Sequence, residues 1–254
     1  VYAFLLKNIE RESQIIIAID EPENSLHTSL CYEQFEKLHE ISLNAQILIT
    51  THWYGFLPII NKGHSHFLDL KSDKIFFESY DLYDYKAKIK NDMDNTKYQF
   101  PNNFTLKSTN DLVQAIYYSL QANKHYNWLI VEGVSEKIYF EYFFKDEITS
   151  HKIRILPLGG QNKVSEVYEY LNLPMREKTN LKGKVFCLID TDLTRHKEHI
   201  KIGTDYLQIR RLSNKNANVP TELLTLENPD TSPTDIEQSL NPNIFKEVME
   251  SLDI

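Results

Sequence analysis

Two short acidic clusters, each placed directly after an apolar run, constrain the fold of this chain more than any other feature. The first runs from Glu132 to Glu136 and follows Leu-Ile-Val, and the second, Asp190 to Asp192, follows Val-Phe-Cys-Leu-Ile. Apolar runs of this length are typical of buried strands in a parallel α/β sheet. Because open α/β folds bind their ligands at the carboxyl edge of the sheet, we expect these carboxylates to lie together there.

Carboxylates that converge on one point repel one another unless cations neutralise them. Hard oxygen ligands select Mg²⁺ or Mn²⁺ over softer metals, so the pattern predicts a divalent-metal site. Each cluster taken alone also has a structural explanation. Asp190 is suited to capping a following helix, and Glu132-Gly133 is compatible with an ordinary strand-to-helix turn.

The order of these motifs resembles the Toprim domain of topoisomerases, primases and nucleases of the OLD (overcoming lysogenization defect) family. The resemblance covers roughly residues 125–254 and implies that Glu132, Asp190 and Asp192 hold the catalytic metal. Glu136 matches an extra acidic residue of the OLD branch, and Glu237 is the best match to a further one. Thr234 with Glu237 also fits a plain helix-capping box, so both explanations of Glu237 stay open.

Three further features of the same region bear on the site. Ser135 is a candidate cap for a helix that runs to about Asp146, with Glu136 near its first turn. A strand over residues 153–158 ends in Gly159-Gly160, which permits close backbone approach, although a purely structural turn explains these glycines equally well. Related nucleases use an assisting lysine, for which Lys163 and Lys246 are candidates.

The first third of the chain carries a second pattern. Residues 15–20 form an apolar run that ends in Asp20 and Glu21, and a second apolar run over residues 46–49 leads to His52. A strand that delivers two acids suits a nucleotide site, with one acid to hold Mg²⁺ and the other to polarise the attacking water. A histidine at the next strand end can reach the terminal phosphate.

This stretch, with its Asp-Glu-Pro-Glu-x-x-Leu-His motif, resembles the ABC-type ATPase of DNA-repair and OLD proteins. The resemblance implies ATP as a cofactor, with Asp20 orienting Mg²⁺, Glu21 acting as the base and His52 sensing the γ-phosphate. No Gly-x-x-x-x-Gly-Lys-Ser/Thr motif occurs in the sequence. We therefore expect that the N-terminal part of the ATPase, with its phosphate loop, has been left out, and that this chain alone does not hydrolyse ATP.

Together these patterns predict an α/β protein of two domains. Residues 1–110 are expected to be the C-terminal half of an ABC-type ATPase domain with a linker. Residues 111–254 are expected to be a Toprim domain, Rossmann-like with a mostly parallel sheet.

The segment between the two patterns is predicted in less detail. Strand-like runs at residues 66–70 and 74–80 predict a hairpin that completes the ATPase sheet. The polar stretch 81–110 is expected to be a linker or mobile insertion, and Asp111 to cap a helix over residues 112–123.

Composition sets the remaining limits. The 254 residues, 41% of them hydrophobic, suffice for two cores, and no apolar run is long enough to cross a membrane. Cys31 and Cys187 are too far apart in the sequence to suggest a disulfide framework, and Cys187 reads as a buried hydrophobe, which fits a soluble cytoplasmic protein. The net charge of −8 argues against a uniformly basic nucleic-acid binder. Basic residues nevertheless flank the second acidic cluster at Lys182, Lys184, Arg195, Lys197, Lys201, Arg210, Arg211 and Lys215.

The leading hypothesis is an ATP-regulated, two-metal endonuclease of the OLD type that cuts DNA in antiphage defence. The resemblance implies a dimer or tetramer, with a retron reverse transcriptase and its DNA, or a second defence protein, as a possible partner. The alternative is a non-catalytic, ATP-gated sensor or scaffold that binds nucleic acid, and a third reading is a repair-type ATPase with a degenerate C-terminal domain. A topoisomerase requires a nucleophilic tyrosine, and nothing in the sequence marks one.

Overall fold

The computed structural model describes residues 15–24, 26, 28–60, 62–71, 74–95, 104–177, 180–191, 204–215, 220–229 and 232–239. The chain divides into two compact units, Val1–His125 and Tyr126–Ile254. This division lies beyond the boundary that the sequence predicted between residues 110 and 111. No helix within the described residues is long and apolar enough to cross a membrane.

The first unit contains a two-stranded parallel sheet. Strand β1 (Ile16–Asp20) pairs with β2 (Gln46–Thr50), with Ile16 opposite Gln46 and Asp20 opposite Thr50. Helix α2 (Thr28–Ser42) connects the strands and packs against β2. The sequence predicted a buried strand at β1, but Ile16 is 65% exposed, because only two strands pair here in the described part of the chain.

The core beneath this sheet is aromatic. Helix α2 buries apolar residues three or four positions apart, and these meet the segment after β2, which includes the 3₁₀ turn η1 (Leu57–Ile59). The ring of Phe35 lies 5.2 Å from Trp53 and 4.8 Å from Phe56. Aromatic pairs at these distances add to the stabilisation that burial itself gives.

The hairpin expected after this core is confirmed. Strands β3 (His64–Lys71) and β4 (Lys74–Asp81) pair antiparallel, from His64 opposite Asp81 to Lys71 opposite Lys74. Among the described residues the hairpin is a separate two-stranded sheet, so the expectation that it completes the sheet of β1 and β2 is wrong.

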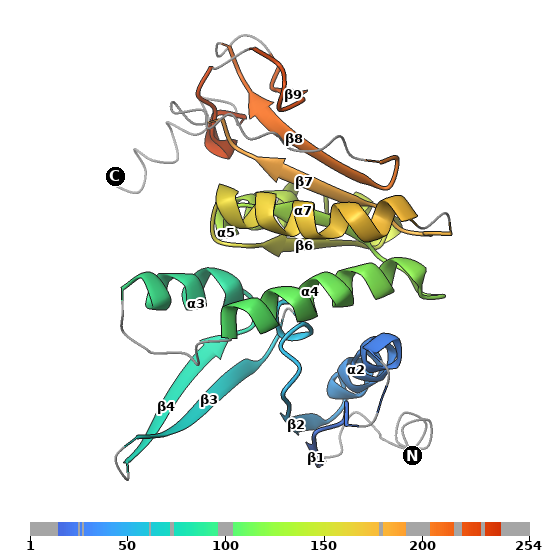
Figure 1. Ribbon diagram of the computed structural model, residues 1–254, viewed down its shortest axis with the longest axis vertical. Helices are drawn as coiled ribbons and strands as arrows, with labels where there is room; N and C mark the ends of the chain where they lie inside the picture. The colour runs from blue at the N-terminus through green and yellow to red at the C-terminus, as the bar shows by residue number, and fades with distance from the viewer. Residues whose placement is uncertain are drawn as a thin grey trace. The chain divides into compact units, whose positions relative to one another are not determined.

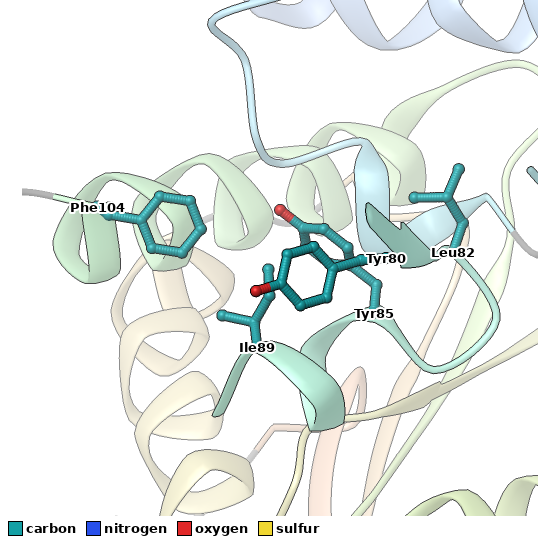
Figure 2. Packing of buried hydrophobic residues seen from close by; sticks show 5 residues of the cluster. All are labelled: Tyr80, Leu82, Tyr85, Ile89 and Phe104. Carbon is teal, nitrogen blue, oxygen red and sulfur yellow. The ribbon is translucent and has the colours of Figure 1, made fainter. Parts of the chain in front are cut away.

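The stretch expected to be a linker is in part folded. Helix α3 (Tyr85–Asp94) occupies its beginning, and its Tyr85 and Ile89 lie four residues apart on one buried face. They pack with three residues from the neighbouring elements, and Figure 2 shows the whole cluster: Tyr80, Leu82, Tyr85, Ile89 and Phe104. The polar composition of residues 81–110 hid this short amphipathic helix.

Helix α4 (Phe104–Gln121) explains why the division between the units differs from the expected one. Asp111 lies inside this helix instead of capping it, and its carboxylate accepts hydrogen bonds from the Tyr54 N–H at 3.0 Å and the Lys107 ammonium at 3.1 Å. A Cβ atom at Gly55 would lie 2.2 Å from the Asp111 carbonyl oxygen. Only glycine permits this close approach, so α4 is anchored in the first unit.

The second unit is built on one five-stranded sheet in the order β6-β5-β7-β8-β9. Strands β7, β8 and β9 of this sheet are labelled in Figure 1. The first four strands of this order are parallel, and β9 is antiparallel to β8. The mostly parallel α/β sheet is therefore confirmed. The strands are β5 (Asn127–Val131), β6 (Ile153–Pro157), β7 (Val185–Ile189), β8 (Leu207–Ser213) and β9 (Glu222–Leu224).

The helices of this unit pack along the sheet. Helix α5 (Val134–Phe143) follows β5 and contacts β5 and β6, and the short α6 (Lys145–Ser150) contacts β6. Helix α7 (Gln161–Glu177) crosses to β7 and also contacts β5 and β8. One apolar cluster ties the strands to the 3₁₀ turn η2 (Ile236–Ser239): Val131, Ile155, Leu188, Leu212 and Ile236. Cys187 is fully buried and Cys31 is buried, and both are free thiols.

Candidate functional site

Glu132 and Asp190 meet at the carboxyl edge of the second unit's sheet. Each follows the last residue of a strand, and the two strands, β5 and β7, are parallel neighbours. The backbone N–H of Asp190 donates to Glu132 Oε1 at 2.8 Å. The predicted meeting of the two acidic clusters is thus a direct contact.

The backbone of Glu132 is held by the two glycines after β6. The N–H groups of Gly159 and Gly160 donate to the Glu132 carbonyl oxygen at 2.7 and 2.9 Å. Their φ angles are +84° and +127°, in a region of backbone conformation that residues other than glycine rarely adopt. The Gly-Gly turn therefore helps to fix the strand end that presents Glu132.

Glu136 lies in the first turn of α5 and is almost fully buried. Its Oε2 accepts the N–H of Gly133 at 3.1 Å. The N-cap is Gly133, in extended conformation, so the prediction that Ser135 caps this helix is wrong: Ser135 is an exposed residue within the first turn. Burial raises the pKa of Glu136, while hydrogen bonds from backbone N–H groups oppose that rise.

Glu237 is brought toward this edge by a pairing distant in sequence. Thr191 and Thr234 form an antiparallel bridge, with N–H to carbonyl distances of 3.0 and 2.9 Å. After burial, the negative charge of Glu237 contributes to the raised pKa values of Glu136, Tyr139 and Asp190. The charge of Glu237 therefore acts on the same group of residues as the strand-end acids.

The capping-box explanation of Glu237 does not describe the structure. The Thr234 hydroxyl accepts the Asn214 N–H at 2.8 Å and donates to the Ser232 carbonyl at 3.0 Å. The turn that contains Glu237 is a 3₁₀ helix from Ile236 to Ser239. Thr234 thus ties this turn to the end of β8.

Asp190 is the most perturbed acid of the group. Burial first, and then the negative charges of four acidic residues, raise its pKa to about 8: Glu136, Glu132, Asp235 and Glu237. Asp235 did not emerge from the sequence, because only the Thr191 bridge places it near Asp190. A carboxyl group with such a pKa holds its proton through much of the neutral range, so the site is electrostatically crowded.

The donor set suits a hard divalent cation, because carboxylate oxygens are the ligands that Mg²⁺ and Mn²⁺ prefer and because a cation would relieve the repulsion around Asp190. Across the described residues, however, no three His, Cys, Asp or Glu side chains are placed to hold one metal ion together. The expected ligand Asp192 and the candidate Lys246 lie outside those residues. Lys163, the other candidate lysine, pairs with Glu166 at 2.7 Å.

The three expected nucleotide-site residues of the first unit also lie together. The Thr50 hydroxyl donates to Asp20 Oδ1. Glu21 has a φ of 41°, and its N–H donates to the Thr50 carbonyl at 3.0 Å. Its carboxylate lies 2.8 Å from His52 Nε2. A non-glycine residue in the left-handed region is uncommon, and such residues concentrate at functional sites.

Glu23 is a further member of this group. Its Oε1 accepts the Thr51 hydroxyl at 2.6 Å and the His52 N–H at 2.7 Å. The contact between Glu21 and His52 contributes little to stability, since the His52 side chain is 79% exposed. Glu23 fixes the backbone of His52 just after the end of β2. The sequence signal was present, since Glu23 belongs to the Asp-Glu-Pro-Glu motif.

The expected basic flank is only partly a surface feature. Lys182, Lys184 and Lys215 are exposed. Arg211 is not part of an exposed flank, because it is 4% exposed and hydrogen-bonded within the unit. Three members lie outside the described residues: Arg195, Lys197 and Lys201.

The second unit thus belongs to the class of α/β domains whose acidic residues meet at the carboxyl edge of a parallel sheet. The family model described as "Overcoming lysogenization defect protein-like, TOPRIM domain" matches residues 126–192. Residues 126–192 are an OLD-like Toprim domain, as the motifs at Glu132 and Asp190 predicted. Such domains are typically metal-dependent nucleases and generally bind divalent metals. A comparison of the chain with curated proteins gave no match.

Proposed function

We propose that this chain is part of an OLD-type endonuclease that hydrolyses phosphodiester bonds of DNA with divalent metal, under the control of ATP, in antiphage defence. The observation that carries the proposal is the contact between Glu132 and Asp190, with the crowding of negative charge that raises the pKa of Asp190 to about 8. Repulsion of this kind is costly unless a cation offsets it, which is the property that a metal-dependent nuclease requires.

The residues proposed to hold Mg²⁺ or Mn²⁺ are Glu132, Glu136, Asp190, Asp192 and Glu237. When bound, a pair of such ions supplies an activated water and stabilises charge on the leaving oxygen. Asp190 must release its proton before its carboxylate can act as a ligand. The Asp190 N–H holds the Glu132 carboxylate at the sheet edge, and the glycine N–H groups hold the Glu132 backbone.

Tyr139 bears on the topoisomerase alternative. It lies on α5, and the negative charge of Glu237 acts on its phenol group. Burial and that charge raise its pKa, so the phenol is harder to deprotonate than a free tyrosine. A nucleophile needs the opposite shift, which favours metal-activated hydrolysis over covalent attack by this residue.

The contacts among Asp20, Glu21, His52 and Glu23 support the proposed link to ATP. Their assigned roles are Mg²⁺ orientation for Asp20, general base for Glu21 and γ-phosphate sensor for His52. In this proposal the chain assembles with further copies as a dimer or tetramer. A retron reverse transcriptase with its DNA, or a second defence protein, is the further partner we propose.

A plasmid-nicking assay tests the nuclease. The chain should convert supercoiled plasmid to the open circle in Mg²⁺ or Mn²⁺ and not in EDTA. Asp190→Asn and Glu132→Gln should each lower the rate by at least about a hundredfold, because each removes a ligand charge with little change in shape. Glu147→Gln, on an exposed position of α6, is the matched control. Unchanged nicking by Asp190→Asn would contradict the assignment.

The second candidate is a non-catalytic, ATP-gated module that binds nucleic acid without cutting it. It is favoured by the finding that no three potential ligands are gathered around one point in the described residues. A gel mobility-shift assay in Mn²⁺ tests this candidate. It is supported if the wild-type chain shifts the DNA but neither binds the ion nor nicks the DNA.

A further inference from the structure

Arg211 is a buried charge that the proposed chemistry does not use. It lies on β8 and is 4% exposed. Nη1 donates to the Thr191 hydroxyl oxygen at 2.9 Å, and Nη2 donates to the Asn228 carbonyl at 2.9 Å. Removing a guanidinium from water is costly unless its hydrogen bonds are well made, so a residue kept in such a place fixes the geometry of its partners.

Thr191, the partner of Arg211, is the residue between Asp190 and Asp192. Its hydroxyl accepts from Arg211 and donates to the Leu212 carbonyl. Its backbone forms the two-hydrogen-bond bridge with Thr234. The middle residue of the Asp-x-Asp motif is therefore fixed by its side chain to β8 and by its main chain to a distant segment.

That distant segment carries the remaining acids. Thr234 is completely buried, and its hydroxyl accepts the Asn214 N–H directly after β8. Asp235 and Glu237 follow it within three residues, and both act on Asp190 electrostatically. The position of these acids relative to Asp190 thus depends on the same bridge that the Thr191 side chain holds.

We propose that Arg211 is a positioning residue of the acidic site, which acts through the Thr191 hydroxyl to set Asp190 against the segment from Thr234 to Glu237. The inference rests on the proposed function, because it assigns Arg211 to the same metal site. Residues that orient metal ligands typically change metal affinity by about 10- to 100-fold when they are mutated. Arg211 is bonded to Thr191, the residue next to Asp190, and is not proposed to touch the metal.

A pair of variants at Thr191 isolates the hydroxyl. Thr191→Val keeps the shape and removes the hydroxyl, whereas Thr191→Ser retains the donor and acceptor. The loss of the free-ion signal in electron paramagnetic resonance measures Mn²⁺ binding. The affinity should be at least about tenfold weaker in Thr191→Val and close to wild type in Thr191→Ser. Arg211→Lys, which keeps the charge but not the two-pronged donor, should resemble Thr191→Val.

A metal-free measurement separates the two proposals. In EDTA, the backbone amide hydrogens at position 191 and of Thr234 should exchange faster in Thr191→Val than in Thr191→Ser. Circular dichroism checks that both variants are folded. Wild-type protein that binds no Mn²⁺ would overturn the proposed function. The amide exchange rates would then still test whether Arg211 and the Thr191 hydroxyl hold the bridge to Thr234. Folded Thr191→Val and Arg211→Lys proteins with wild-type Mn²⁺ affinity, or unchanged amide exchange, would overturn the role of Arg211.

Discussion

At the scale of single residues, Asp190 shows how charge and burial combine at this sheet edge. Its backbone holds one acid, Glu132, while its side chain feels the charge of that acid and of three others. Glu132 and Asp190 could be predicted from the sequence, because each directly follows an apolar run that is typical of a buried parallel strand. Strand order could not predict the effect of Asp235 on Asp190, which depends on a bridge between segments far apart in the chain. It could not predict the burial of Arg211 either, whose partners Thr191 and Asn228 are distant in sequence.

The raised pKa of Asp190 predicts how stability depends on pH in metal-free protein. The folded state keeps the proton up to about pH 8, whereas the unfolded chain loses it near the ordinary value of 3.8. By holding this proton, Asp190 stabilises the folded state. That stabilisation is fully present below pH 4 and is lost as pH rises through 8. Asp190→Asn should remove this loss, and should be more stable than wild type by ~2 kcal/mol at pH 9, a value discounted because solvent screens a partly buried group.

Urea unfolding in EDTA from pH 5 to pH 9 measures this difference. The free energy of unfolding of the wild type should fall more steeply with pH than that of Asp190→Asn. Parallel pH profiles for the two proteins would mean that Asp190 titrates normally in the folded state.

Glu23 gives a second prediction at this scale. Glu23→Ala removes a charged acceptor from both the Thr51 hydroxyl and the His52 N–H, so it should lower the free energy of unfolding of the first unit by ~2 kcal/mol. Glu23→Gln retains an oxygen acceptor and should lose less. Urea unfolding compares the variants, and equal losses would show that the carboxylate oxygen is not the anchor of the His52 backbone.

At the scale of elements, the regular strands were predictable and the capping and packing details were not. The apolar runs at residues 185–189 and 46–49 match β7 and β2 closely. Strand β7 is almost wholly buried, as a continuous apolar run in a parallel sheet predicts, whereas β2 alternates between exposed and partly buried residues. Helix α3 was missed, since its two buried residues are surrounded by polar ones. The cap of α5 fell on Gly133 and not on Ser135, because the Glu136 carboxylate reaches back to the Gly133 N–H.

Gly55 tests the placement of α4 in the first unit. Gly55→Ala would put a Cβ atom 2.2 Å from the Asp111 carbonyl oxygen, so either the helix or the loop must move. We expect a loss of ~3 kcal/mol in the free energy of unfolding, the upper range for overpacking. Gln114→Ala, an exposed change on the same helix, should stay within ~0.5 kcal/mol of wild type. Urea unfolding that finds both variants equally stable would contradict the packing described.

At the scale of the whole molecule, the chain contains two compact units, and a family match covers part of the second. The second contains an OLD-like Toprim domain, which the order of the two acidic motifs after apolar runs had indicated. In the first, Thr50 hydrogen-bonds Asp20 and the Glu21 carboxylate contacts His52, and the assignment of these residues to an ATP site stays a prediction. The division between the compact units falls after residue 125 and not after residue 110, because α4 is anchored to Gly55 through a contact distant in sequence.

Calorimetric titration of the chain with Mn²⁺ measures whether the acids at the carboxyl edge of the Toprim sheet hold a divalent cation, as we propose. We expect saturable binding that tightens from pH 6 to pH 8 as Asp190 gives up its proton. Asp190→Asn and Glu132→Gln should each bind Mn²⁺ more than about tenfold more weakly, and the control Glu147→Gln should bind as the wild type does. No binding by the wild type, or wild-type affinity in both ligand variants, would show that these acids do not form a metal site.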